Sequence, residues 1–86
     1  MALRLWYVYI LYSPSTGRLY TGVAIDPGKR LGQHNDGKGA KNTKYGRPWQ
    51  IVWTRKCDGQ SEALKLEYRI KQLKRKEKLL LTGLSA

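Results

Sequence analysis

The first quarter of the chain has the pattern of two strands joined by a turn. Residues 6–12, Trp-Tyr-Val-Tyr-Ile-Leu-Tyr, are aromatic or β-branched at nearly every position, and residues 18–23 follow after the turn sequence Ser-Pro-Ser-Thr-Gly at 13–17. Strand-forming residues on both sides of a Pro and Gly turn predict a β-hairpin.

The register of this hairpin follows from the length of its loop. If residues 14–17 form the loop, Leu11 faces Tyr20 and Tyr9 faces Gly22. Side chains alternate between the two faces of a strand, so Tyr9 and Tyr20 are predicted on one face. Gly22, without a side chain, would let a ligand or another part of the chain approach closely, or would mark a bulge.

The middle of the chain predicts a helix, a loop and a third strand. Asp26 and Pro27 are an N-cap and a first helical residue, and the helix can run toward Gly37. Residues 37–48 hold three Gly, a Pro and four basic residues, which indicates a basic loop. Residues 50–56 have the composition of a third strand.

The C-terminal third predicts two helices. We expect Ser61 to cap a long helix, and residues 74–78 to separate it from a short last helix that ends near Gly83. The long helix buries a stripe at three- and four-residue spacing, formed by Ala63, Leu66, Ile70 and Leu73. Residues 1–86 are thus predicted to form one domain of the α/β (α+β) class, in the order ββαβαα.

Charge indicates the partner. Seventeen Lys and Arg against six Asp and Glu give a formal net charge of +11, spread along the chain. Such a field attracts polyanions, so nucleic acid is the expected partner. No apolar run approaches the roughly 20 residues of a membrane span, and no membrane is expected. One Cys and one His exclude an internal disulfide and a Cys/His zinc cage, and a reducing cytoplasm fits best.

Glu67 is the most informative candidate residue. Helical spacing places it at the edge of the apolar stripe, one turn before Lys71. A carboxylate there needs a cation, since burial would otherwise neutralise it. An ion pair with Lys71 or with Arg30 would explain it, and so would a bound Mg²⁺ ion.

Two further pairs have both a structural and a chemical interpretation. Tyr9 and Tyr20 would be core residues, or two phenols that flank Gly22 in a site. Arg30 and His34 lie four apart on one helix face. They would be solvated surface residues, or an Arg that clamps a phosphate beside a His that moves a proton.

Together these elements resemble the paired motif of the GIY-YIG nuclease superfamily. Tyr7-Val8-Tyr9 and Tyr20-Thr21-Gly22 stand at the family's spacing, and Arg30 and Glu67 follow in the family's order. The chain is most similar to small bacterial single-domain members, which share the Gly-Lys-Gly-Ala-Lys loop at 37–41. The resemblance implies a three-stranded antiparallel sheet flanked by helices.

The resemblance also implies an activity, the hydrolysis of DNA phosphodiester bonds with one divalent cation, Mg²⁺ or Mn²⁺. Carried over by position, Glu67 would bind the metal and Arg30 would stabilise charge on the phosphate. Tyr9 and Tyr20 would orient or deprotonate the attacking water, and His34 would assist. A phenol has an ordinary pKa near 10, so a base at Tyr9 requires a nearby cation that lowers it.

The chain departs from the family at two places. Tyr7 replaces the first glycine of the motif, and no Asn follows Asn42, although many enzymes of the superfamily carry an Asn beyond the glutamate helix. The expectation is an endonuclease, with a role in DNA repair or recombination. The alternative is a basic binding module without catalysis. In both, the loop would hold the nucleic-acid backbone, DNA before RNA, through Lys38, Lys41, Lys44 and Arg47. A protein partner could supply substrate choice.

Overall fold

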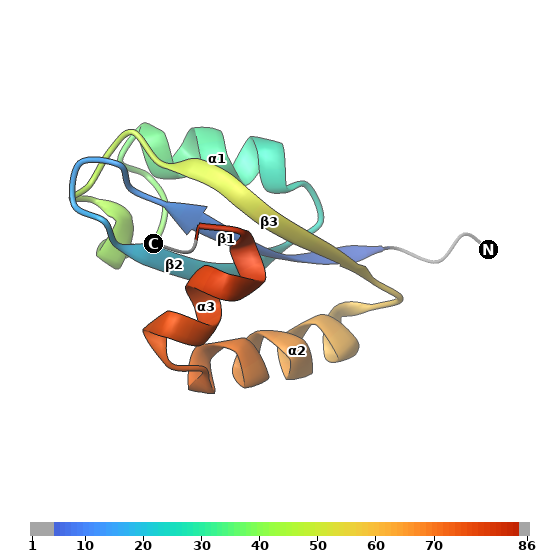
Figure 1. Cartoon of the computed structure of the whole chain (residues 1–86). Helices are drawn as coiled ribbons and strands as arrows, with labels where there is room; N and C mark the ends of the chain where they lie inside the picture. Colours follow the sequence, from blue (N-terminus) through green and yellow to red (C-terminus); the bar gives the residue numbers. More distant parts are fainter. Residues whose placement is uncertain (1–4, 85–86) are drawn as a thin grey trace.

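The computed structural model describes residues 5–84, which form a three-stranded antiparallel sheet with helices on both faces (Figure 1). The strands are β1 (Trp6–Tyr12), β2 (Leu19–Ala24) and β3 (Gln50–Cys57), in the spatial order β2-β1-β3. The helices are α1 (Pro27–Asn35), α2 (Gln60–Gln72) and α3 (Arg75–Thr82), with a short 3₁₀ helix η1 (Lys41–Thr43). The predicted fold class and element order are confirmed.

The hairpin register is the predicted one. Tyr9 pairs with Gly22 and Leu11 pairs with Tyr20. The turn is closed by the Gly17 N–H, which donates to the carbonyl of Ser13 at 2.7 Å. Strand β2 lies at one edge of the sheet, so a β1 side chain that extends across β2 reaches that edge.

The sheet separates two apolar clusters, so the molecule has three layers. On one face Val8 and Ile10 pack with Ala63 and Ile70 of α2. On the other face lies a second cluster, formed by Tyr9, Leu11, Ala24 and Trp49, with Leu31 of α1 against it. In Figure 1, α1 accordingly covers one face and α2 with α3 cover the other.

Helix α1 begins as predicted. The Asp26 side chain accepts a hydrogen bond from the Lys29 backbone N–H at 3.1 Å, and Pro27 opens the first turn. The helix ends at Asn35, because the Gly37 backbone turns to φ 79°, which glycine adopts without strain.

The boundaries of the C-terminal helices differ from the prediction. Helix α2 begins at Gln60 with Gly59 as its N-cap, so the expected Ser61 cap is wrong. The reason is that Gly is tolerated at an N-cap, while the carboxylate of Glu62 accepts from the Asp58 N–H at 3.4 Å. The stripe holds at Ala63 and Ile70, which are buried. Leu73, in extended conformation, follows the helix instead of extending its stripe.

Helix α3 is longer than expected. Residues 75–78, which were expected to precede the helix, form its first turn, because the Glu77 carboxylate accepts from the Lys74 N–H at 2.8 Å at the helix start. Its predicted end is confirmed at Gly83, where φ is 77°. Among residues 5–84, no helix is long and apolar enough to cross a membrane.

Candidate active site

Tyr9 and Gly22 form the centre of the candidate site. Tyr9 is only 1% exposed, and its hydroxyl passes directly over Gly22 on the neighbouring strand. A Cβ atom added at Gly22 would lie 2.6 Å from the Tyr9 hydroxyl oxygen and 3.2 Å from the Tyr20 ring. Gly22 therefore permits a close approach and marks no bulge, since the β1–β2 pairing continues without a shift through it.

His34 lies beneath this hydroxyl. Its side chain is fully buried, which rules out the surface interpretation for this residue. The Tyr9 oxygen is 3.0 Å from His34 Nε2, and His34 Nδ1 is 2.7 Å from Thr43 Oγ1. The four-residue spacing predicted that His34 and Arg30 share one face of α1. It did not predict that the His34 side chain is buried.

The direction of these hydrogen bonds can be derived. The Thr43 hydroxyl donates its one proton to the carbonyl of Ala40 at 2.8 Å, so its oxygen must accept from His34 Nδ1–H. A neutral imidazole with its proton on Nδ1 is an acceptor at Nε2. Tyr9 therefore donates to His34, and a relay runs from Tyr9 through His34 and Thr43 to Ala40.

The packing around the imidazole fixes its orientation. The Tyr20 ring meets the His34 ring edge to face, with centroids 5.1 Å apart. On the other side Gly39 is so close that an added Cβ would overlap the imidazole and lie 2.9 Å from the His34 Cα. Trp49 anchors the loop through its indole N–H, which donates to the Thr43 carbonyl at 2.9 Å.

Burial shifts the pKa of both Tyr9 and His34. Burial, reinforced by the neighbouring Tyr20, raises the pKa of Tyr9 to about 12, although the positive charge of Arg30 opposes this. Burial also lowers the pKa of His34, and Arg30 adds to that effect. Arg30 does lower the Tyr9 pKa, but burial outweighs it, so the pKa lies above the ordinary value and not below it. At neutral pH Tyr9 is a phenol and His34 is a neutral acceptor.

Arg30 lies at the mouth of the site. Its guanidinium is half-buried and donates to the side chain of Gln33 at 2.6 Å. It lines a hollow of about 420 Å³ at the end of β2, together with Ala24, Ile25, Asp26, Lys29 and Gln33. Gln33 takes one of the five N–H donors of the guanidinium, so others remain available for an anion in this hollow.

Glu67 approaches from α2, on the other face of the sheet. Its side chain is 18% exposed and forms an ion pair with Lys71, with 3.3 Å between Oε2 and Nζ. This is the i to i+4 pair named as the structural interpretation. The Glu67 charge contributes to the raised pKa of Tyr9, as the last of several causes, so the carboxylate lies within electrostatic reach of the phenol.

The donor set restricts the kind of metal that could bind. No group of three or more His, Cys, Asp or Glu side chains comes together within residues 5–84. Glu67 offers one hard oxygen ligand. That set fits Mg²⁺, which keeps several waters and is often bound by one or two carboxylates together with substrate phosphates.

The predicted basic loop borders the site. Its four predicted cations, Lys38, Lys41, Lys44 and Arg47, are all exposed. The segment contains η1 instead of being a loop throughout, and Thr43 of η1 connects it to His34. Thr43 and Gly39 were not among the predicted site residues, although both lie in or beside the Gly-Lys-Gly-Ala-Lys motif on which the resemblance rests.

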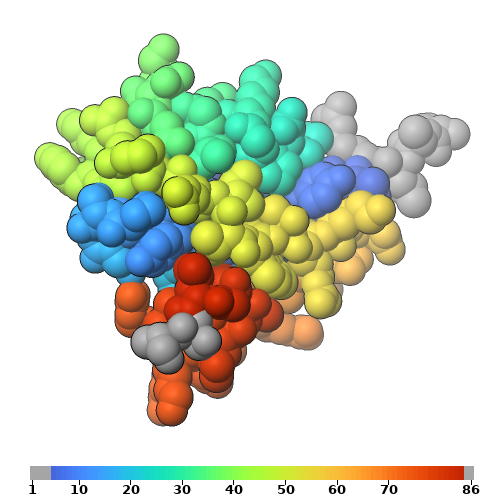
Figure 2. Space-filling view, turned by 45° about the horizontal axis from the view of Figure 1, so that its top comes forward, coloured from blue at the N-terminus to red at the C-terminus, as the bar shows by residue number. Residues whose placement is uncertain are grey.

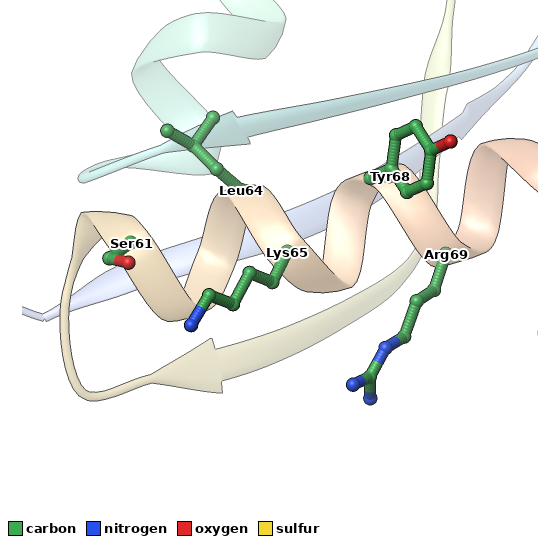
Figure 3. A pocket seen from close by; sticks show the side chains of 5 residues that line it. All are labelled: Ser61, Leu64, Lys65, Tyr68 and Arg69. Carbon is green, nitrogen blue, oxygen red and sulfur yellow. The ribbon is translucent and has the colours of Figure 1, made fainter.

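A second hollow lies on the outer side of α2 and is separate from the relay. It is lined by Ser61, Leu64, Lys65, Tyr68 and Arg69, and Figure 3 shows Leu64 and Tyr68 on one side of the helix and Lys65 and Arg69 on the other. None of the predicted site residues lines it. Tyr68 is 67% exposed, so its aromatic ring is open to solvent on this surface.

Known proteins are similar to this chain in sequence. The family model of the GIY-YIG catalytic domain matches residues 5–80. A UPF0213 protein of Staphylococcus saprophyticus is 51% identical over 75 residues, which cover 87% of this chain and 90% of the relative. A UPF0213 protein of Pectobacterium carotovorum is 48% identical over 73 residues, 85% of this chain and 73% of the relative.

A solved structure is similar as well. The solution NMR structure of the UPF0213 protein BH0048 from Bacillus halodurans is 39% identical, with a TM-score of 0.57. The match covers 93% of this chain and 84% of that protein.

Proposed function

Because the chain belongs to the GIY-YIG family of nuclease domains, we propose that it is a metal-dependent endonuclease that hydrolyses phosphodiester bonds in DNA. The observation that carries this proposal is the relay from Tyr9 to Ala40. A buried Tyr that donates to a neutral His, itself held in one tautomer by Thr43, is arranged to move a proton.

The relay offers a way to activate water without a phenolate. A standing phenolate does not form at neutral pH, because the Tyr9 pKa is about 12. The Tyr9 oxygen can instead accept a proton from a water while its own proton passes to His34 Nε2. Tyr20, whose hydroxyl makes no hydrogen bond within the described part of the chain, is placed to orient that water or the substrate.

Charge on the phosphate is the second requirement. Arg30, fixed by Gln33 and beside an open hollow, would donate to the non-bridging oxygens as negative charge grows on them. Glu67 would hold the divalent cation, Mg²⁺ or Mn²⁺, which when bound would offset further negative charge. We propose that Lys38, Lys41, Lys44 and Arg47 hold the flanking backbone.

Direct cleavage tests the proposal. End-labelled single-stranded, duplex and branched DNA, with matched RNA, are incubated with Mg²⁺ or Mn²⁺ and beside EDTA. We expect cutting of DNA that EDTA abolishes. Salt-sensitive binding without cutting of any substrate would instead favour the binding module. The Glu67–Lys71 ion pair and the small set of metal ligands would then explain the lack of cleavage.

The cell biology is part of the proposal. A role in DNA repair or recombination fits a small nuclease that holds its substrate by the backbone, and a protein partner could supply the choice of substrate. The single Cys57 is buried and free, which suits a reducing compartment such as the cytoplasm.

The pH dependence of cleavage tests the relay. The relay requires neutral His34, whose pKa is lowered from its ordinary value of about 6.5. We expect the single-turnover rate to be full at neutral pH and to fall only in acid, below the ordinary imidazole pKa of about 6.5, when His34 takes up a proton. A His34→Gln variant should be slow and flat over this range. If the rate of that variant still fell at low pH as in the wild-type chain, the fall would be due to another titratable group.

A further inference from the structure

A cluster of cations lies away from the candidate site, where the start of β2 meets α3. It surrounds a hollow of about 230 Å³ lined by Arg18, Leu19, Arg75 and Lys78, which we call the basic cleft. Figure 2 shows the blue turn between β1 and β2 close to the orange and red atoms of α3. Three of the four lining residues carry a positive charge, and none is among the predicted site residues.

One hydrogen bond holds the basic cleft together. The Arg75 guanidinium donates to the Gly17 carbonyl at 2.6 Å across 58 positions of sequence. Gly17 adopts φ 74°, a conformation that presents this carbonyl within the turn. A guanidinium has five N–H donors, so most of those on Arg75 stay available for a ligand. This hydrogen bond tethers the guanidinium to the turn beside the basic cleft.

The basic cleft has a surplus of positive charge. Within residues 5–84, no ion pair involves Arg18, Arg75 or Lys78; the pair that the structure shows joins Glu67 to Lys71. Glu77, the carboxylate of α3, accepts from the Lys74 N–H at the start of the helix. Three neighbouring cations repel one another, and an anion with several oxygen acceptors removes that repulsion.

The basic cleft and the candidate site share the edge strand. From Leu19 to Gly22 along β2 is three residues, roughly 10 Å at about 3.3 Å per residue. Leu19 packs with the cluster on the face that α2 covers, which is the side from which Glu67 approaches. A nucleic-acid strand that follows the edge of β2 would pass both places.

We propose that the basic cleft binds a backbone phosphate of the substrate strand, a few nucleotides from the cleaved bond. This assignment rests on the proposed nuclease function. The net charge of +11 and the shared edge strand favour nucleic acid over the other common source of phosphate, a lipid headgroup. The basic cleft would thereby set the path of the strand across the site.

Binding under conditions without cleavage tests this. The double variant Arg18→Gln, Lys78→Gln keeps the Arg75 tether, and Lys56→Gln, Lys76→Gln removes the same charge at exposed positions outside the basic cleft. Fluorescence anisotropy with a single-stranded oligonucleotide in EDTA gives the affinity over a salt series. We expect the cleft variant to bind about tenfold more weakly than the control, and its salt slope to fall by about 0.7 per cation neutralised.

Neutral phosphates locate the contact. Single methylphosphonate substitutions along the oligonucleotide should weaken binding to the wild-type chain at one flanking position, and this effect should vanish in the cleft variant. Equal affinity and slope in the two double variants, or the same methylphosphonate pattern in both, would overturn the assignment. So would reduced binding to phosphatidylserine vesicles in the cleft variant with unchanged binding of the oligonucleotide.

The two proposals can fail separately. The EDTA binding data report on the basic cleft even if the wild-type chain cuts nothing, which would overturn only the nuclease function. Conversely, a small phosphodiester such as bis(p-nitrophenyl) phosphate does not span from the site to the basic cleft. Its hydrolysis should be unchanged in the cleft variant, and a parallel loss would show that the substitutions act on the site itself.

Discussion

Replacing Glu67 with Gln is expected to remove metal-dependent cleavage while leaving the fold and nucleic-acid binding intact. Gln keeps the shape of the side chain but loses the charge that binds a divalent cation. A metal supplies several kcal/mol of charge stabilisation, so the cleavage rate should fall at least about 1000-fold. Single-turnover cleavage, with thermal unfolding beside it, measures both consequences.

The ion pair with Lys71 provides the matched control. If Glu67 served only that pair, Lys71→Gln would have the same effect as Glu67→Gln. The pair is half open to solvent on the lysine side, with 51% of that side chain exposed, so breaking it should cost about 0.5 kcal/mol or less. We expect Lys71→Gln to cleave within a few-fold of the wild-type rate. Equal losses in both variants would make Glu67 a structural residue.

The hairpin shows what the sequence could predict. Its register depends on the loop at 14–17 and on alternation along two strands, both of which are local. The pattern of residues alone therefore placed Tyr9, Tyr20 and Gly22 correctly. The long helix was also predictable, because Ala63 and Ile70 mark one face by their spacing. Its start at Gln60 was missed, since Ser61 is the better N-cap by composition alone.

The relay shows what the sequence could not predict. His34 and Thr43 are nine residues apart, and they meet only because the chain turns back through the glycine-rich loop onto α1. Nothing periodic marks Thr43. The direction of the Tyr9 pKa shift could not be predicted from composition either. It depends on burial, which outweighs the charge of Arg30. The local pattern of residues predicts the face on which a side chain lies. Its protonation state depends on the tertiary packing around it.

Gly22→Ala is expected to lower cleavage by about 100- to 10,000-fold, the usual contribution of a positioned proton-transfer group. The added Cβ would lie 2.6 Å from the Tyr9 hydroxyl oxygen and 2.7 Å from Cζ, so the buried ring must move off His34 Nε2. The resulting strain of about 1–3 kcal/mol is partly offset by about 0.4–1 kcal/mol from the stiffer unfolded chain. The variant should therefore fold, with weaker stability, and still bind nucleic acid.

The matched control is the same substitution at Gly32, in α1, where an added Cβ would meet nothing within 4 Å. Gly32→Ala should keep full cleavage and gain about 1 kcal/mol of stability from helix propensity. A double variant Gly22→Ala, Tyr9→Phe decides the mechanism. If the alanine acts by displacing Tyr9, adding it to Tyr9→Phe should cost little further activity. Full additivity of the two losses would mean that Gly22 serves the substrate directly, as the floor on which the phosphodiester lies.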